Sequence, residues 1–426
     1  MRVLLTGAHG FIGNAILNGL HAHGHQVVAA VHRQQPLTTT DVSYVPVDFT
    51  HDHHSDDWLP RLKNIDVVIN CVGIIRETSQ QGFNALHRDA PIALFKACSL
   101  AGVKKVIQLS ALGADAQASS QYHLSKRAAD DFLATLDIDW LILRPSIVIG
   151  SRAASSELFR ALAALPLIPI INHGRQKIQP IIIDDLVRIV IQSVAQTENS
   201  QQRIDAVGGE AVSLRDLLTL FRDQLGLGPA RFIRIPFQLG LWLAALAKPL
   251  SNGIINRETV QMLQRDNIAD VQNITFRFGF TPVSVSEWLS RHPVSQAERW
   301  QAQLFFLAPL LRISLAFLWI ATGYISLFVF PYDESYHLLA KLGLYGNVAS
   351  LALYTGGLID IVLGLALFMQ YQIRLVVYLQ ILIMITYTIL ISTGLPEFWL
   401  HPFGPITKNI PLIVATLMLP VFAGKR

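Results

Sequence analysis

The first 150 residues alternate short apolar, β-branched runs with stretches whose apolar residues recur at helical spacing. The pattern predicts strands over residues 3–6, 27–31, 43–47, 66–71, 106–110 and 140–144. It predicts helices over residues 11–23, 90–101 and 122–136. Apolar strands separated by helices indicate an α/β fold, a Rossmann-type doubly wound parallel sheet with both faces covered.

The alternation loosens between residues 151 and 300. Residues 179–183 predict a strand, and Asp184 and Asp185 after it predict a helix N-cap. We therefore assign residues 1–150 to the Rossmann core. Residues 151–300 are assigned to the remaining Rossmann elements and a small, mostly helical cap for the substrate.

Residues 301–426 are far more apolar than the rest. They hold only ten of the 64 charged residues. Apolar runs over 311–330, 348–369, 375–393 and 405–423 predict an all-α domain of four transmembrane helices, since a span needs about 20 apolar residues. The first run has Arg312 at its start, the second has Asp360 near its middle, and the last has Lys408 near its start. A charge at that depth is usually functional, but Asp360 could equally form a structural pair with Arg312 or Lys408.

The loop charges predict an orientation. Arg291, Arg299 and Arg312 precede the first span, and Arg374 lies between the second and third. By the positive-inside rule, both the N-terminal domain and the C-terminus are cytosolic. The N-terminus lacks the apolar run of about 7–15 residues that a signal peptide needs. We expect a multi-pass protein of the inner (cytoplasmic) membrane.

Overall charge and cysteine content exclude other classes. The formal net charge of +4 gives no broad basic field, so no nucleic-acid partner is expected. The chain has only two cysteines, Cys71 and Cys98, which excludes a disulfide framework. Both lie in apolar stretches, so both are expected in the core. The run from His51 to His54, near two aspartates, leads into a helix where polar residues are ordinary, so no metal site is predicted.

Three glycines connect the first strand to the first helix, Gly7, Gly10 and Gly13. Gly7 permits a tight turn, Gly10 lets the backbone approach a pyrophosphate, and Gly13 lets helix and strand pack closely. The phosphates are expected at the positive end of the helix, beside Phe11 and Ile12. This context predicts a dinucleotide site; the alternative is a plain strand-to-helix turn.

The end of the second strand distinguishes the two nicotinamide cofactors. An acid there would hydrogen-bond the ribose 2′-hydroxyl of NAD. This chain has Val31-His32-Arg33, with no acid before Asp41. Arg33 can neutralise a 2′-phosphate, which favours NADP(H) over NAD(H); the alternative is a solvated arginine.

A tyrosine and a lysine lie four residues apart on one predicted helix, Tyr122 and Lys126. A lysine beside a phenol would lower the phenol pKa and suit the tyrosine for proton transfer. Ser110, at the end of the fifth strand, could polarise a substrate carbonyl, and Ser119 and Ser120 compete for that role. A surface Tyr–Lys pair without chemistry is the alternative.

Together these residues resemble the extended or atypical short-chain dehydrogenase/reductase superfamily, whose members are NAD(P)-dependent and include epimerases and dehydratases. The resemblance is carried by Gly7, Gly10, Gly13, Asp48, Asn70-Cys71-Val72-Gly73, Ser110, Tyr122, Lys126 and Arg144-Pro145-Ser146. Over roughly residues 1–295 the likeness is closest to the family of the nucleotide-binding accessory subunit of respiratory complex I. The tail is similar to the DoxX-like family of four-helix membrane proteins.

The resemblance implies cofactor contacts. Asp48 would meet the adenine, Pro145 would lie near the nicotinamide, and Gly73 would line the cofactor site. Tyr122 would be the general acid/base, and Lys126 would tune it and bind the ribose.

Three functions follow. The first is a membrane-anchored oxidoreductase that transfers hydride between NADP(H) and a carbonyl or alcohol of a lipophilic substrate, which a membrane anchor favours. The second is a non-catalytic NADPH-binding assembly or sensor protein that belongs to a membrane complex of the respiratory or quinone-dependent kind. The third is an epimerase or dehydratase of the sugar-nucleotide type.

One apolar run in the cap bears on the membrane. Residues 236–248 are too short to span a bilayer but carry Trp242 inside and Lys248 at the end. This composition suits a helix at the lipid interface, in contact with membrane lipid. The alternative is a buried cap helix.

Overall fold

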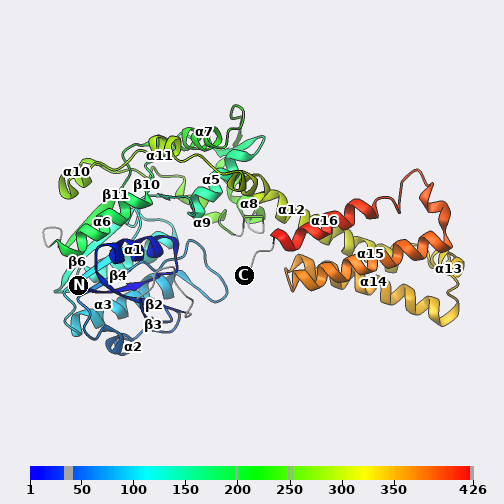
Figure 1. The fold of residues 1–426 in the computed structure, drawn as a ribbon, viewed down its shortest axis with the longest axis horizontal. Helices are drawn as coiled ribbons and strands as arrows, with labels where there is room; N and C mark the ends of the chain where they lie inside the picture. Colours follow the sequence, from blue (N-terminus) through cyan, green and yellow to red (C-terminus); the bar gives the residue numbers. More distant parts are fainter. Residues whose placement is uncertain (33–41, 197–199, 248–249, 252, 423–426) are drawn as a thin grey trace. The chain divides into compact units, whose positions relative to one another are not determined.

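The structure is a computed structural model that describes residues 1–32, 42–196, 200–247, 250–251 and 253–422. It divides into two compact units, Met1–Gln303 and Leu304–Arg426 (Figure 1). Each unit is described by itself.

The first unit is built on a parallel sheet of seven strands in the order β11-β6-β5-β4-β1-β2-β3. The strands are β1 Arg2–Thr6, β2 Gln26–Val31, β3 Ser43–Pro46, β4 Val67–Asn70, β5 Lys105–Leu109, β6 Asp139–Pro145 and β11 Gln202–Ala206. The predicted α/β fold and its six strands are confirmed. β11 was missed, because its sequence Gln-Arg-Ile-Asp-Ala lacks an apolar run. The strand order reverses between β1 and β4, where ligands bind in such sheets.

Alternate residues of each strand pack on opposite faces of the sheet. Val3 and Leu5 join one core with helices α1 (Phe11–Ala22) and α6 (Ile183–Ala195). Leu4 joins the other core with helices α3 (Ala90–Leu100) and α4 (Gln121–Leu133). All three side chains are fully buried, which is the period of two expected of a strand covered on both faces.

The residues after β6, apart from α6 and β11, form short two-stranded ribbons and helices outside the main sheet, and we call this region the cap. The ribbon strands are β7 Val148–Ile149, β8 Ile168–Ile171, β9 Lys177–Ile178, β10 Ile181–Ile182, β12 Val212–Ser213 and β13 Phe232–Ile235. The helices are α5 Ala154–Ala164, α7 Leu214–Gln224, α8 Phe237–Ala247, α9 Arg257–Met262, α10 Gln272–Phe278 and α11 Val285–Arg291. Phe159, Phe221 and Trp288 share the buried core of this region.

The predicted N-cap at Asp184 and Asp185 is wrong. Ile182 occupies the N-cap of α6, and both aspartates lie in its first turn. There the carboxylate of Asp185 accepts a hydrogen bond of 2.7 Å from the backbone N–H of Val283. The acids therefore favour the helix start through its dipole, and Asp185 also holds a later loop in place.

The second unit is helical. Its elements are α12 Gln296–Tyr324, which begins in the first unit, η3 Ile325–Val329, α13 Tyr332–Lys341, α14 Gly346–Phe368, α15 Ile373–Gly394, η4 Pro396–Trp399 and α16 Asn409–Phe422. Three described helical segments are long and apolar enough to cross a membrane, Gln296–Val329, Gly346–Phe368 and Ile373–Gly394. The fourth predicted span contains α16, whose 14 residues fall short of the roughly 20 that a crossing needs. The number of crossings stays a prediction.

The proposed ion pair of Asp360 with Arg312 or Lys408 is not found among the described residues. Arg312 instead donates from Nη1 to the backbone oxygens of Leu367 and Phe368, at 3.3 and 2.7 Å. These carbonyls belong to the C-terminal end of α14, where a guanidinium is favourable. Asp360 is buried within the same helix.

Candidate active site

The glycine turn after β1 has the close contacts that require glycine. Gly7 has a φ of 71°, and a Cβ there would lie 3.0 Å from the backbone of Cys71. A Cβ at Gly13 would lie 2.1 Å from the oxygen of Gly7. Gly10 is the N-cap of α1, which has no side-chain cap. The first N–H groups of the helix are therefore free of a side-chain cap, an arrangement that fits a pyrophosphate.

The side chains of Phe11 and Ile12 pack against protein. The Phe11 ring lies against Gly150, so closely that a Cβ added there would be 2.7 Å from the ring. Ile12, also in α1, packs against the core on that face of the sheet. Any contact that these two residues make with a cofactor phosphate would therefore come from their backbone N–H groups.

Buried polar side chains connect the ends of three neighbouring strands. The Thr6 hydroxyl donates to Asn70 Oδ1 at 2.6 Å, and Asn70 Nδ2 donates to Gln108 Oε1 at 2.8 Å. The backbone N–H of Cys71 donates to Thr6 Oγ1 at 3.2 Å. This row holds the glycine turn of β1 against the end of β4, at the reversal point of the sheet.

Tyr122 and Lys126 lie on one face of α4, as predicted. Lys126 is buried, its Nζ donates to the oxygen of Leu109 at 3.0 Å, and it lies 5.8 Å from the centre of the Tyr122 ring. A Cβ at Gly73 would lie 3.4 Å from the same Nζ. The ends of β4 and β5 and the face of α4 thus meet at one ammonium group.

The expected lowering of the Tyr122 pKa is wrong for this arrangement. Burial raises the pKa of Tyr122 to about 12, and the negative charge of Asp130 adds to the rise. Burial also lowers the pKa of Lys126, against the opposing effects of Asp130 and Cys71. Since Lys126 lies over the ring and donates to a backbone carbonyl, it does not offset the burial of the phenol.

Ser110 is bonded to an acid that the sequence reasoning missed. Its hydroxyl donates to Oδ2 of Asp130 on α4. Both side chains are buried, and Asp130 Oδ1 has no hydrogen-bond partner among the residues that the structure describes. Burial raises the pKa of Asp130 to about 6, although the Ser110 bond and Lys126 oppose the rise.

The competing serines have other positions. Ser120 is the N-cap of α4, and its Oγ accepts from the backbone N–H of His123 at 3.2 Å. Ser119 is exposed in the preceding loop. Of the three serines, Ser110 is the one bonded to the buried face of α4. While its proton points to Asp130, its oxygen can only accept from other groups.

A second missed residue, His87, locks the start of α4 in place. It lies in a π-helix, η2 (Asn84–Asp89), and its Nε2 accepts from the backbone N–H of Ile74 at 3.0 Å. Its Nδ1 therefore carries the proton and donates to Ser125 Oγ at 3.0 Å, and Ser125 donates to the oxygen of Tyr122 at 2.9 Å. Burial, aided by Lys126, lowers the pKa of His87 to about 2, so the ring is neutral. Its ring centre lies 5.4 Å from that of Tyr122.

Asp48 follows β3 and is strongly hydrogen-bonded. Thr50 and His51 both bond its carboxylate, and His32 at the end of β2 lies 3.7 Å away. Burial works to raise the pKa of Asp48, but the bonds from Thr50 and His51 outweigh it and lower the value to about 2. Arg33, the predicted 2′-phosphate ligand, lies outside the described residues.

Pro145 ends β6, and its carbonyl accepts from the backbone N–H of Leu112 at 2.9 Å. This bond holds the loop after β5, which leads toward Tyr122, against β6. Beside it, Arg144 and Asp205 of β11 form an ion pair at 2.6 Å.

The side chains of the histidine-rich run after β3 bond to nearby side chains and to the backbone. Asp52 pairs with Arg61 at 2.6 Å and accepts from the backbone N–H of Asp48. His53 Nε2 lies 3.1 Å from the oxygen of Phe49. Cys98 is buried as expected, whereas Cys71 is only partly so.

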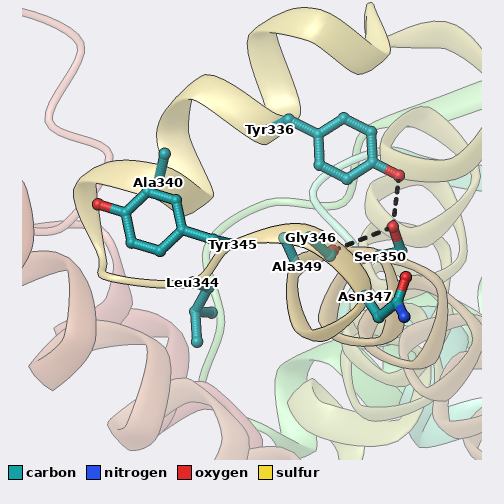
Figure 2. A pocket seen from close by; sticks show the side chains of 8 residues that line it. All are labelled: Tyr336, Ala340, Leu344, Tyr345, Gly346, Asn347, Ala349 and Ser350. Atoms are coloured by element: carbon teal, nitrogen blue, oxygen red, sulfur yellow. Dashed lines mark hydrogen bonds between the residues drawn. The ribbon is translucent and has the colours of Figure 1, made fainter.

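A separate hollow of about 460 Å³ lies in the second unit, beside α13 and the start of α14. Tyr336 bonds Ser350 at 3.0 Å across it, and Asn347 also lines it (Figure 2). None of its eight lining residues is acidic, basic or histidine. It has no residues for hydride or proton transfer beyond the tyrosine phenols.

Comparison with known proteins defines the class of each part. Residues 7–158 match the NAD(P)H-binding family, and residues 316–417 match the DoxX-like family. The UDP-glucuronic acid 4-epimerase of Bacillus cereus, solved with NAD, has the same fold: TM-score 0.54 at 19% identity, covering 72% of this chain and all of that one. The chain therefore joins an NAD(P)-binding Rossmann domain, with epimerase/dehydratase-like structural neighbours, to a C-terminal DoxX-like domain.

Two curated relatives make the likeness more specific. Subunit 9 of the NADH dehydrogenase (ubiquinone) 1 alpha subcomplex of Arabidopsis thaliana is 24% identical over 290 residues, which cover 64% of this chain and 71% of the plant protein. The ceramide reductase of Caulobacter vibrioides is 30% identical over 173 residues, which cover 40% of this chain and 54% of that protein. The alignment thus spans about half of the reductase. The predicted resemblance to complex I accessory subunits and to the DoxX-like family is confirmed.

Proposed function

We propose that the chain is a membrane-anchored, NADP(H)-dependent oxidoreductase that reduces a carbonyl group, or oxidises the corresponding alcohol, on a lipophilic substrate. The observation that carries the proposal is the convergence of Tyr122, Lys126 and Gly73 beside the glycine turn. A nucleotide-binding turn alone needs no buried lysine beside a tyrosine ring.

The residues present fit a dinucleotide. The turn at Gly7 and Gly13 leaves no room for a Cβ, and α1 begins without a side-chain cap. These groups would hold the pyrophosphate, and Lys126 would reach the nicotinamide ribose. When bound, NADPH would supply the hydride for the carbonyl carbon.

The chain itself would supply the proton. In the reducing direction, the Tyr122 hydroxyl donates to the substrate oxygen, and a phenol with a raised pKa remains protonated and able to donate. Lys126 would stabilise the phenolate that remains. His87 is neutral and bonded at both nitrogens, so it holds the helix start in place and leaves proton transfer to the phenol.

Two finer assignments belong to the same proposal. Arg33 favours NADP(H) over NAD(H), because a guanidinium can neutralise a 2′-phosphate. The membrane unit supports a lipophilic substrate, and so does a relative named as a ceramide reductase. The cytosolic face of the inner membrane is the proposed location of the first unit.

A second function has its own support. In a non-catalytic NADPH-binding assembly or sensor protein of a membrane complex, Tyr122 would need no activation. Its raised pKa, together with the bond that directs the Ser110 proton to Asp130, fits that role. The plant relative is named as subunit 9 of an NADH dehydrogenase (ubiquinone) subcomplex.

The test is consumption of NADPH by the full chain in proteoliposomes. Vesicles would contain either a long-chain keto lipid or the same amount of a short, water-soluble ketone. The proposal predicts NADPH oxidation with the keto lipid and little with the soluble ketone. Nucleotide that copurifies with the chain and is never oxidised by any carbonyl would favour the assembly role.

A further inference from the structure

Helix α8 of the cap exposes a complete apolar face. Leu239, Trp242 and Leu246 are 47%, 59% and 55% exposed, and their spacing of three and four residues places them on one side of the helix. Gly240 and Ala244 are buried on the other side. We call Leu239, Trp242 and Leu246 the α8 face.

The buried side fixes which way the α8 face points. A Cβ at Gly240 would lie 2.4 Å from the side chain of Ile171 in β8. β8 pairs with β13, which leads directly into α8. The helix thus packs on its own ribbon through small residues and turns its large ones outward. Leu167, just before β8, and Ile233 in β13 are also exposed, at 55% and 49%.

The sequence around α8 carries one sign of charge. From Gly226 to Arg257 there is no aspartate or glutamate, whereas Arg231, Arg234, Lys248 and Arg257 are basic. Three of these lie in the part of the chain that the structure describes, and all three are exposed: Arg231, Arg234 and Arg257. Between Gly226 and Arg257 the exposed apolar face is accompanied only by basic residues, and the first acid after them is Glu258 in α9. This mainly basic composition matches a membrane surface with anionic head groups.

The chain also joins the first unit directly to the first candidate span. Helix α12 begins at Gln296 in the first unit and continues without interruption into the first candidate span. At about 1.5 Å per residue, the eight residues of this helix that belong to the first unit extend only about 12 Å. Only this short stretch of α12, which also contains Pro309 further on, separates the first unit from the apolar residues of the span.

We propose that the α8 face inserts into the lipid interface and that the basic residues around it bind anionic head groups. Trp242 lies at the depth of the head groups, where its indole N–H stays hydrated. The inference concerns how the first unit meets the membrane and is independent of whether the unit turns over a substrate.

The test uses the native tryptophan. The full chain and its Trp242→Phe variant are reconstituted into vesicles of phosphatidylcholine and phosphatidylglycerol, with or without bromine on the acyl chains near the head group. The difference in emission between the two proteins reports Trp242. The proposal predicts that brominated lipid quenches this difference and that aqueous iodide does not.

A matched control moves the tryptophan elsewhere. Leu100 is 69% exposed on α3 of the Rossmann core, so Leu100→Trp in the Trp242→Phe background should be quenched by iodide and not by brominated lipid. If Trp242 is quenched by iodide alone, its face is in water. If neither agent quenches it, the face is covered by protein, either the spans of this chain or a partner. Both results overturn the proposal.

Discussion

The Ser110 hydroxyl donates a hydrogen bond to the carboxylate of Asp130. Asp130 lies two helical turns beyond Tyr122 on the same face of α4. The bond joins the end of β5 to the helix that carries the proposed acid. It also means that the serine is an acceptor toward any substrate until that bond is broken. If Ser110 assists the reaction as proposed, Asp130 would control whether it can polarise a carbonyl.

The buried carboxyl of Asp130 predicts a pH-dependent stability. Its pKa rises from an ordinary 3.8 to about 6 in the folded chain, mainly through burial. The folded state therefore binds this proton more tightly than the unfolded state, so stability is full below 3.8 and falls as pH rises through about 6. The loss is about 3 kcal/mol. Thermal unfolding of the purified chain across this interval measures it.

Asp130→Asn should remove much of that pH dependence, since an amide does not ionise and its oxygen still accepts from Ser110. The control is Asp137→Asn, an exposed acid just after the same helix. It should leave the pH profile unchanged. An Asp130→Asn profile that matches wild type would show that Asp130 does not titrate in this range.

The glycine turn predicts a graded loss of nucleotide affinity. Gly13→Ala places a methyl 2.1 Å from the Gly7 oxygen, so the turn must open. NADPH affinity should fall at least about tenfold, or 1.4 kcal/mol. Gly10→Ala, at 3.2 Å from the same oxygen, should cost less, and Gly228→Ala, with no atom within 4 Å, should cost nothing. Titration calorimetry that gives three equal affinities would contradict the assigned turn.

Cofactor choice is predicted from Arg33. Wild type should bind NADPH more tightly than NADH, because the guanidinium neutralises the 2′-phosphate. Arg33→Asp should reverse the order, since an acid there bonds the ribose hydroxyls and repels the phosphate. Parallel titrations of both nucleotides check this. Equal affinities that the substitution leaves unchanged would exclude Arg33 as the determinant.

Topology is open to reporter fusions. Fusions after Tyr336 and after Glu397 should report the extracytoplasmic side, and fusions after Gln372 and at the C-terminus the cytosol. The 3.6 Å pair of Lys341 with Glu397 places the loop after the first span beside the loop after the third, as expected if both lie on one side. A cytosolic signal at Tyr336 would mean a reversed bundle or fewer crossings.

Much of this fold was predictable because its signals are local. The alternation of buried strands with amphipathic helices specified six of the seven strands of the sheet. The glycine spacing specified the first turn. The seventh strand, Gln202–Ala206, was missed because it lies at the sheet edge and is half polar. Helix α12 begins at Gln296, well before the predicted span at 311. Its first turns are polar, so a search for apolar runs does not reveal them.

The site was less predictable because it depends on contacts between distant residues. Asp130 carried a signal that was overlooked, since Tyr122, Lys126 and Asp130 recur every four residues and so share a helical face. His87 carried none, because it reaches Ser125 from 38 residues away and from a π-helix. The direction of the Tyr122 pKa shift depends on burial, which spacing alone does not reveal.

The most direct measurement of the central claim follows the hydride itself. The full chain in proteoliposomes would receive a long-chain keto lipid and NADPH that carries deuterium at the transferable hydride position. The lipid would then be extracted and its deuterium content measured by mass spectrometry. Wild type should yield a deuterated alcohol. Tyr122→Phe should yield almost none while binding NADPH nearly as tightly, because only the proton donor is lost. Deuterium transfer by Tyr122→Phe at the wild-type rate would remove the tyrosine from the mechanism, and no transfer by wild type would contradict the oxidoreductase assignment.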